Sequence, residues 1–157
     1  MFSLFAGFWN YYFSRPSIHI LLIGLDHAGK TTILEAMKTK FGKSHGLPPE
    51  KIPPTIGMNL AKLVYNGSQV IVWDLGGQIK MRSVWERYYS EANAVVFVVD
   101  SADISRLEEA KLAYDAACDN DSLTESETPV LIIANKQDLP VSQKSPSSII
   151  YRLILSM

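Results

Sequence analysis

The sequence has little cysteine and no excess of charge of either sign. Cys118 is the single cysteine among 157 residues, which excludes an internal disulfide and fits a reducing compartment such as the cytosol. We expect its thiol to pack as a small buried hydrophobe on a helix. The formal net charge is −1, so no basic field points to nucleic acid as a partner. No apolar run approaches the roughly 18 residues that a membrane-spanning helix needs.

Charge is also absent from the N-terminal stretch, which is crowded with aromatic side chains. It is too short to cross a bilayer and lacks the positive start of a signal peptide. Near-helical spacing of its large side chains predicts an amphipathic helix over residues 1–15 that lies at a membrane interface. Packing of this helix on the protein core is the other interpretation. The aromatic residues are Phe2, Phe5, Phe8, Trp9, Tyr11, Tyr12 and Phe13.

Apolar runs alternate with helical patterns along the rest of the chain, which predicts an α/β protein with a mostly parallel sheet and flanking helices. An Asn-Gly pair at 66–67 favours a tight hairpin turn and adds one antiparallel strand. Asp103 or Ser105 is expected to cap the third helix. Strands are expected over 18–23, 60–65, 69–73, 94–99 and 129–134; helices are expected over 30–41 and 104–118, with a loop and helical stretch over 76–91.

Residues 24–31 read GLDHAGKT and match the phosphate-loop pattern G-x-x-x-x-G-K-[ST] between an expected strand and an expected helix. Backbone N–H groups of such a loop surround phosphate oxygens at a helix N-terminus. Lys30 is expected to reach the β- and γ-phosphates, and the Thr31 hydroxyl to ligate Mg²⁺. A chance glycine-rich turn is the alternative, which the strand and helix on either side disfavour. The expected nucleotide contacts here are Gly24, Leu25, Asp26, His27, Ala28, Gly29, Lys30, Thr31 and Thr32.

Three residues further along are expected to complete the magnesium and γ-phosphate site. Asp74 follows the strand over 69–73, where an aspartate holds magnesium through water. Gly77 gives the pattern D-x-x-G, whose backbone N–H can meet the γ-phosphate. Thr55 could supply a second hydroxyl ligand. Each residue alone could equally be an ordinary strand exit or an ordinary loop threonine.

The base is indicated by N-K-x-D at 135–138, directly after the strand expected over 129–134. The Asp138 carboxylate can accept hydrogen bonds from the N1–H and 2-amino groups of guanine, a donor pair that adenine lacks. Asn135 is expected to brace the loop, and the stem of Lys136 to cover the base. Together these motifs predict binding of GTP or GDP with Mg²⁺. Another P-loop enzyme such as a nucleotide kinase would leave 135–138 unexplained.

The motifs resemble the Arf branch of small GTPases, which have a P-loop NTPase fold of the small G-protein type. The specific matches are the phosphate loop, Pro-Thr-Ile-Gly at 54–57, Trp-Asp-Leu-Gly-Gly-Gln at 73–78 and Asn-Lys-Gln-Asp at 135–138. The resemblance implies a GDP/GTP switch that hydrolyses GTP slowly without an activating protein. Gln78 would orient the attacking water, and a partner would supply an arginine.

The resemblance also implies partners and a location. An exchange factor, a GTPase-activating protein and effectors would act on the switch regions, the effectors through Met58, Trp73 and Tyr88. Packing is the alternative role of these three side chains. Phe2 excludes N-myristoylation, which requires glycine after the initiator methionine. The implied location is cytoplasmic, peripherally on Golgi or trans-Golgi membranes with a receptor, in vesicle-mediated transport of proteins.

After Leu139 the family pattern is not continued. A small GTPase needs another strand with a loop over the guanine and then a final helix. The apolar run at 149–155 could occupy the place of that strand, but neither the loop triplet nor the final helix has a counterpart at 140–157. We therefore expect an incomplete GTPase domain over 16–139 and a divergent tail over 140–157. Two hypotheses follow: a working GTPase switch, or a truncated, inactive or unstable GTPase-like fragment that at most competes for partners.

Overall fold

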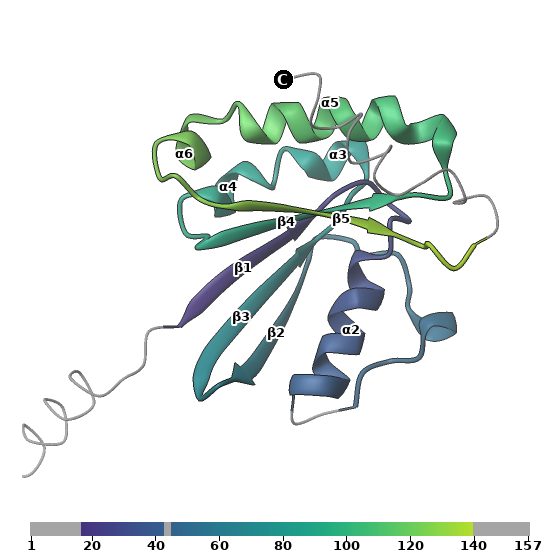
Figure 1. The fold of residues 1–157 in the computed structure, drawn as a ribbon, viewed down its shortest axis with the longest axis vertical. Coiled ribbons are helices and arrows are strands. Elements are labelled where there is room, and N and C mark those ends of the chain that lie inside the picture. The colour runs from purple at the N-terminus through teal and green to yellow at the C-terminus, as the bar shows by residue number, and fades with distance from the viewer. Residues whose placement is uncertain (1–16, 43–44, 140–157) are drawn as a thin grey trace, which may run out of the picture.

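The computed structural model describes residues 17–42 and 45–139. The helix expected over 1–15 and the tail over 140–157 lie outside these residues. Within them, five strands form one sheet in the order β2-β3-β1-β4-β5 (Figure 1). Neighbouring strands are parallel except β2 and β3, which pair antiparallel. The mostly parallel α/β fold is therefore confirmed. The strands are β1 (Ile18–Ile23), β2 (Met58–Tyr65), β3 (Ser68–Leu75), β4 (Ala94–Asp100) and β5 (Val130–Asn135).

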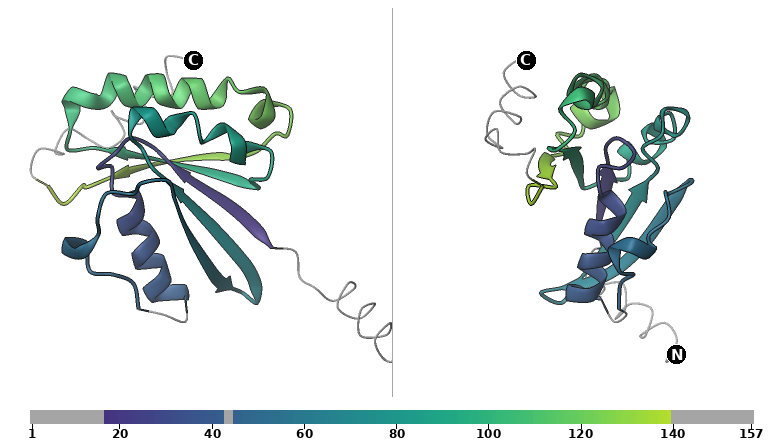
Figure 2. Two further views of the ribbon diagram at one scale, coloured as in Figure 1. Left: turned by 180° about the vertical axis from the view of Figure 1, so that it is seen from behind. Right: turned by 90° about the vertical axis from the view of Figure 1, so that its right-hand side faces the viewer.

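Helices cover both faces of the sheet (Figures 1 and 2). Helix α2 lies on one face, and α3, α4, α5 and α6 lie on the other. None of the helices within 17–42 and 45–139 has the length and apolarity to cross a membrane. The helices are α2 (Lys30–Phe41), α3 (Ile79–Arg82), α4 (Glu86–Tyr89), α5 (Leu107–Cys118) and α6 (Asp121–Thr124), with 3₁₀ turns η1 (Pro49–Lys51) and η2 (Ile104–Arg106).

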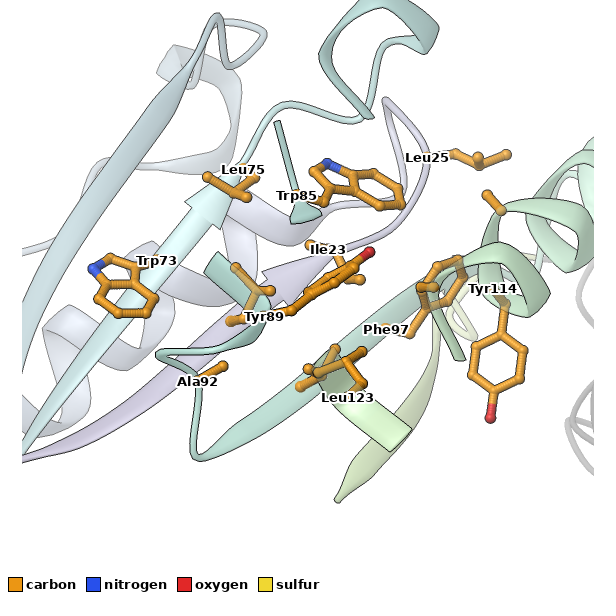
Figure 3. Close-up of a cluster of buried hydrophobic side chains, with 14 of the residues drawn as sticks. Ile23, Leu25, Trp73, Leu75, Trp85, Tyr89, Ala92, Phe97, Tyr114 and Leu123 are labelled. Carbon is orange, nitrogen blue, oxygen red and sulfur yellow. The ribbon is translucent and has the colours of Figure 1, made fainter. Parts of the chain in front are cut away.

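Alternation along the central strands produces two hydrophobic cores, one under each layer of helices. Leu21 and Ile23 of β1 point to the α5 side, whereas Leu22 between them points to the α2 side. On the α5 side, Phe97 meets the rings of Trp85 and Tyr114 edge to face, with centroids 6.4 and 5.3 Å apart (Figure 3). Burying each large apolar side chain contributes about 1.5–3 kcal/mol. The two cores hold the carboxyl ends of β1, β3, β4 and β5 in fixed positions.

The hairpin between β2 and β3 forms as the sequence predicts. Tyr65 pairs with Ser68 at its tip. Asn66 and Gly67 adopt positive φ of 47° and 75°, the conformation that a type I′ turn requires. The right-handed twist of the two strands is matched by this turn. The prediction of one antiparallel strand in the sheet is confirmed.

The loop and helical stretch expected over 76–91 is present, whereas the prediction over 104–118 needs correction. The stretch over 76–91 contains two short helices, α3 and α4, joined by 3₁₀-type turns such as Trp85 N–H to the Arg82 carbonyl. The helix expected over 104–118 begins with the 3₁₀ turn η2, and no side-chain cap is formed there. The Asp103 carboxylate instead accepts a hydrogen bond from the Ser105 hydroxyl at 2.6 Å. Helix α6 was not predicted, because four residues are too few for a periodic pattern.

Candidate functional site

The phosphate loop connects β1 to α2 at the carboxyl end of the parallel strands, where open α/β sheets bind ligands. Gly24 and Gly29 have φ of +135° and +91°. A Cβ at Gly24 would lie 2.2 Å from the Val98 carbonyl oxygen, and one at Gly29 would lie 2.2 Å from Asn135 Nδ2. Only glycine fits either position. Gly29 forms the N-cap of α2 without a side-chain cap, so the first turn can offer its N–H groups to a phosphate.

Lys30 is buried beneath this loop. Its Nζ donates hydrogen bonds to the carbonyl oxygens of Gly24 at 2.9 Å and Leu25 at 2.7 Å. Burial lowers the pKa of the ammonium from 10.5 to about 8, although Asp74 and Asp26 oppose the shift. The loop therefore surrounds a cation that is less firmly protonated than an exposed lysine.

Three oxygen-bearing side chains from distant segments meet beside Lys30. Thr31 Oγ1 donates to Asp74 Oδ2 at 2.6 Å and lies 2.7 Å from Thr55 Oγ1. Asp74 is fully buried, and its Oδ1 has no hydrogen-bond partner among the described residues. Burial raises the pKa of this carboxyl, and the Thr31 hydrogen bond opposes the rise.

This cluster fits magnesium. Mg²⁺ prefers hard oxygen ligands, keeps several waters, and uses one or two carboxylates together with substrate phosphates. Two hydroxyls and one carboxylate with an unpartnered buried oxygen meet that description. Within the described residues, no group of three or more His, Cys, Asp or Glu side chains could hold a metal ion.

The N-K-x-D segment is held against the phosphate loop. Asn135 Nδ2 donates to the Ala28 carbonyl at 2.8 Å, and the Asn135 carbonyl accepts from the Ser101 N–H at 3.0 Å. The bracing role predicted for Asn135 is therefore visible in the structure. Lys136 has a positive φ of 61°, and its Nζ donates to Asp100 Oδ2 at 2.6 Å. Asp138 follows in an exposed turn.

A cavity of about 450 Å³ lies between these segments, within the range of small-molecule sites. Most of the predicted contacts line it; Gly24, Leu25, Ala28, Asp74, Asn135 and Asp138 do not. Sequence reasoning missed one wall, which the proline-rich loop before Thr55 forms. The proline content of that loop was the available signal. The lining residues are Asp26, His27, Gly29, Lys30, Thr31, Thr32, Pro49, Ile52, Pro53, Pro54, Thr55, Gly77, Gln78 and Lys136.

The three residues predicted to face effectors differ in exposure. Met58 is 43% exposed, whereas Trp73 is 7% exposed and packs between the rings of His19 and Tyr88, at centroid distances of 4.7 and 5.4 Å. Tyr88 is half-buried. Trp73 therefore packs in the interior, which is the alternative role expected for these side chains. Cys118, expected to be buried, is half-buried at the end of α5 beside the core.

Known proteins match this chain over most of its length. The model of the ADP-ribosylation factor family matches residues 5–156, past residue 139 where the recognisable motifs end. ADP-ribosylation factor-related protein 1 of Homo sapiens is 40% identical over 147 residues, which cover 93% of this chain and 72% of that protein. ADP-ribosylation factor-like protein 3 of Saccharomyces cerevisiae is 38% identical over 139 residues, which cover 88% of this chain and 69% of that protein.

A solved structure has the same fold. The Arl6 BBS3 small GTPase from Trypanosoma brucei, with the bound nucleotide analogue GppNp, is similar with a TM-score of 0.76 and 31% identity. The match covers 90% of this chain and 79% of the other. The chain therefore belongs to the ADP-ribosylation factor family of small GTPases, which bind GTP or GDP with Mg²⁺ and hydrolyse GTP.

Proposed function

We propose that this chain is a GDP/GTP switch that works in the cytoplasm on Golgi membranes, in vesicle-mediated transport. One observation carries the membrane assignment: residues 1–14 lack charge and are rich in aromatic side chains. Such a segment suits the interface between headgroups and acyl chains. In this proposal, residues 1–15 contact the membrane, residues 16–139 form the GTPase domain, and residues 140–157 follow as a tail.

The cavity is proposed to hold the nucleotide phosphates. Nucleotide binding by this chain is supported by its similarity to the Arl6 BBS3 small GTPase, which holds the nucleotide analogue GppNp. Lys30 would contact the β- and γ-phosphates, and Thr31 and Thr55 would ligate magnesium, with Asp74 acting through water. Magnesium supplies positive charge to the phosphate oxygens. The unpartnered Oδ1 of Asp74 would then gain a donor, which removes the cost of a buried oxygen without a hydrogen bond.

Base recognition and hydrolysis are proposed to use the segments on either side of the phosphates. The Asp138 carboxylate would accept hydrogen bonds from the guanine N1–H and 2-amino groups, with the Lys136 stem over the ring. The Gly77 N–H would face the γ-phosphate, and Gln78 would orient the attacking water. An activating protein would contribute an arginine, and an exchange factor would open the site. Effectors would read the surface around Met58 and Tyr88.

Membrane association that depends on the bound nucleotide tests the proposal. A fluorescently tagged chain with GTP retained should overlap a trans-Golgi marker in cells, and the GDP-bound chain should be diffuse. Trp9→Glu, which places a charge in the uncharged stretch, should abolish the overlap while leaving nucleotide binding unchanged. A diffuse distribution in both nucleotide states would contradict the membrane assignment.

Nucleotide affinity should fall at alkaline pH because of Lys30. The pKa of its ammonium in the free chain is about 8. Bound phosphate raises that pKa, since an opposite charge favours the protonated form. Below the pKa of the free chain, the ammonium is already protonated before the nucleotide binds. Above it, binding must take up a proton, so affinity falls by up to about tenfold per pH unit. Titration with fluorescent GDP between about pH 7 and about pH 9.5 measures this slope.

Lys30→Gln is the control for that slope. This variant should bind weakly at every pH and show a shallower slope than the unsubstituted chain over the same range. Equal affinity of the unsubstituted chain across the range would contradict a lowered pKa of Lys30 in the free chain.

Thr31→Asn should weaken binding of GTP more than binding of GDP. The Thr31 hydroxyl contacts both Asp74 and Thr55, so its loss removes the centre of the proposed magnesium site. Because GTP carries more phosphate charge for magnesium to neutralise, binding of the triphosphate would depend more on the ion that Thr31 holds. We expect GTP affinity to fall by about tenfold or more relative to GDP affinity. Thr31→Ser retains the hydroxyl and should bind normally. Equal losses for both nucleotides would count against the ligand role.

A further inference from the structure

A network of four charged side chains joins α3, α5 and the phosphate loop. Arg106 Nη2 donates to Asp26 Oδ1 at 2.8 Å, and its Nε donates to Glu109 Oε2 at 2.8 Å. The other carboxylate oxygen of Glu109 accepts from Arg82 Nη2. Arg82 Nε in turn donates to the Gly77 carbonyl at 3.1 Å. Carboxylates and guanidinium groups alternate along this network, so each charge faces an opposite one.

The network closes on itself through the backbone of Gly77. A Cβ added to Gly77 would lie 2.3 Å from the Asp26 nitrogen and 2.4 Å from the Gly24 carbonyl oxygen, so this glycine rests directly on the phosphate loop. Starting from Asp26, contacts therefore run through Arg106, Glu109 and Arg82 to Gly77 and back to Asp26. Three separate stretches of the chain, 24–26, 77–82 and 106–109, are fixed relative to one another by this ring.

The charges of the ring are maintained at neutral pH. The hydrogen bond from Arg106 lowers the pKa of Asp26, and hydrogen bonds from Arg106 and Arg82 lower the pKa of Glu109. The side chains are about one-fifth to one-third exposed, and isolated ion pairs at such exposure contribute little to stability. The arrangement instead fixes positions, because the guanidinium fork of each arginine binds two partners at once.

The geometry bears on the residue after Gly77. The Gly77 carbonyl and the Gln78 N–H belong to one planar peptide group, so a donor fixed on that carbonyl fixes the orientation of the whole plane. The preceding carbonyl, of Gly76, accepts from Trp85 Nε1 at 3.0 Å. Both carbonyls before Gln78 are thus held by side chains of the following segments. Only the Gly77 contact is connected to the charged network.

We infer that Arg82, Glu109 and Arg106 are positioning residues for GTP hydrolysis, which hold the Gly77–Gln78 peptide against the phosphate loop. This inference rests on the proposed role of Gln78. A second ion pair on α5 joins Lys111 and Asp115, neither of which lines the cavity. It supplies the comparison that separates positioning from simple support of the helix.

Glu109→Gln and Asp115→Asn form a matched pair of carboxylate-to-amide substitutions on one helix. Glu109→Gln should slow single-turnover GTP hydrolysis by about tenfold, because small displacements of catalytic groups are costly, while nucleotide affinity changes less than about twofold. Asp115→Asn should change neither quantity. Arg82→Lys keeps the positive charge but loses the Nε donor to Gly77, so it should resemble Glu109→Gln. Unchanged hydrolysis in Glu109→Gln, or wild-type hydrolysis in Arg82→Lys, would overturn the inference.

Hydrogen–deuterium exchange separates this inference from the role of Gln78. Peptides covering residues 75–82 should exchange faster in Glu109→Gln than in Asp115→Asn or the unsubstituted chain. Failure of the unsubstituted chain to hydrolyse GTP would contradict the role of Gln78, whereas the exchange rates would still decide whether the network holds the loop. Equal exchange in all three proteins would overturn the inference even if hydrolysis is normal.

Discussion

Asp138→Asn is expected to weaken binding of both GDP and GTP by at least about a hundredfold, because two hydrogen bonds to the base are disturbed at once. The proposed carboxylate accepts from the guanine N1–H and 2-amino groups. An amide in its place retains one acceptor and presents an NH₂ group to another donor. Asp138 lies in an exposed turn, so its replacement should leave the folded core unchanged. Titration with fluorescent GDP measures the loss.

Two controls make this prediction specific to the base. Xanthine carries a carbonyl at the position of the guanine 2-amino group, and the side-chain amide that Asp138→Asn introduces can donate to that carbonyl. The Asp138→Asn variant should therefore prefer xanthosine diphosphate. Asp119→Asn changes another exposed aspartate, at the end of α5, and should bind GDP normally. Normal GDP affinity in Asp138→Asn would remove this residue from base recognition.

Gln78→Leu is expected to leave nucleotide affinity within about twofold and to reduce hydrolysis stimulated by an activating protein by about a hundredfold or more, the usual scale for a group that assists proton transfer or positions water. The exposed Gln78 side chain lines the cavity. Its backbone carbonyl accepts from the Met81 N–H at 2.8 Å, and leucine preserves that contact. Phosphate release with a fixed amount of activating protein measures the effect.

Gln69→Leu makes the same change at an exposed position of β3, outside the cavity lining, and should hydrolyse GTP at the normal rate. Stimulated hydrolysis that is equal in Gln78→Leu and the unsubstituted chain would remove Gln78 from the mechanism. A large loss of affinity in Gln78→Leu would instead assign it to binding.

Local sequence predicts the parts of the fold that depend on local physics. Strand β1 and helix α2 have the predicted bounds, because an apolar run ends at Gly24 and a helical pattern follows Gly29. Asn66 and Gly67 also predict their turn from local sequence, because few residues tolerate positive φ. The division of 76–91 into two short helices could not be predicted, because short turns and short helices have similar hydrophobic patterns.

Part of the candidate site could likewise be predicted from the sequence, and part could not. Its phosphate loop and N-K-x-D segment have fixed spacings, so their residues could be named from the sequence, and the structure places both segments together through Asn135 and the Ala28 carbonyl. The charged ring could not be predicted, because Asp26 and Arg106 are 80 positions apart and no periodic pattern relates them. Such contacts follow from the packing of α5 beside the phosphate loop.

Binding of guanine nucleotides by residues 1–157 tests the account most directly. Fluorescent GDP, GTP and ATP would be titrated into the purified monomer with magnesium, and circular dichroism would establish that it is folded. The account predicts saturable, submicromolar binding of GDP and GTP, with ATP at least about a hundredfold weaker, because adenine cannot pair with the Asp138 carboxylate. A folded monomer that shows no saturable binding, or that binds ATP as tightly as GTP, would contradict it.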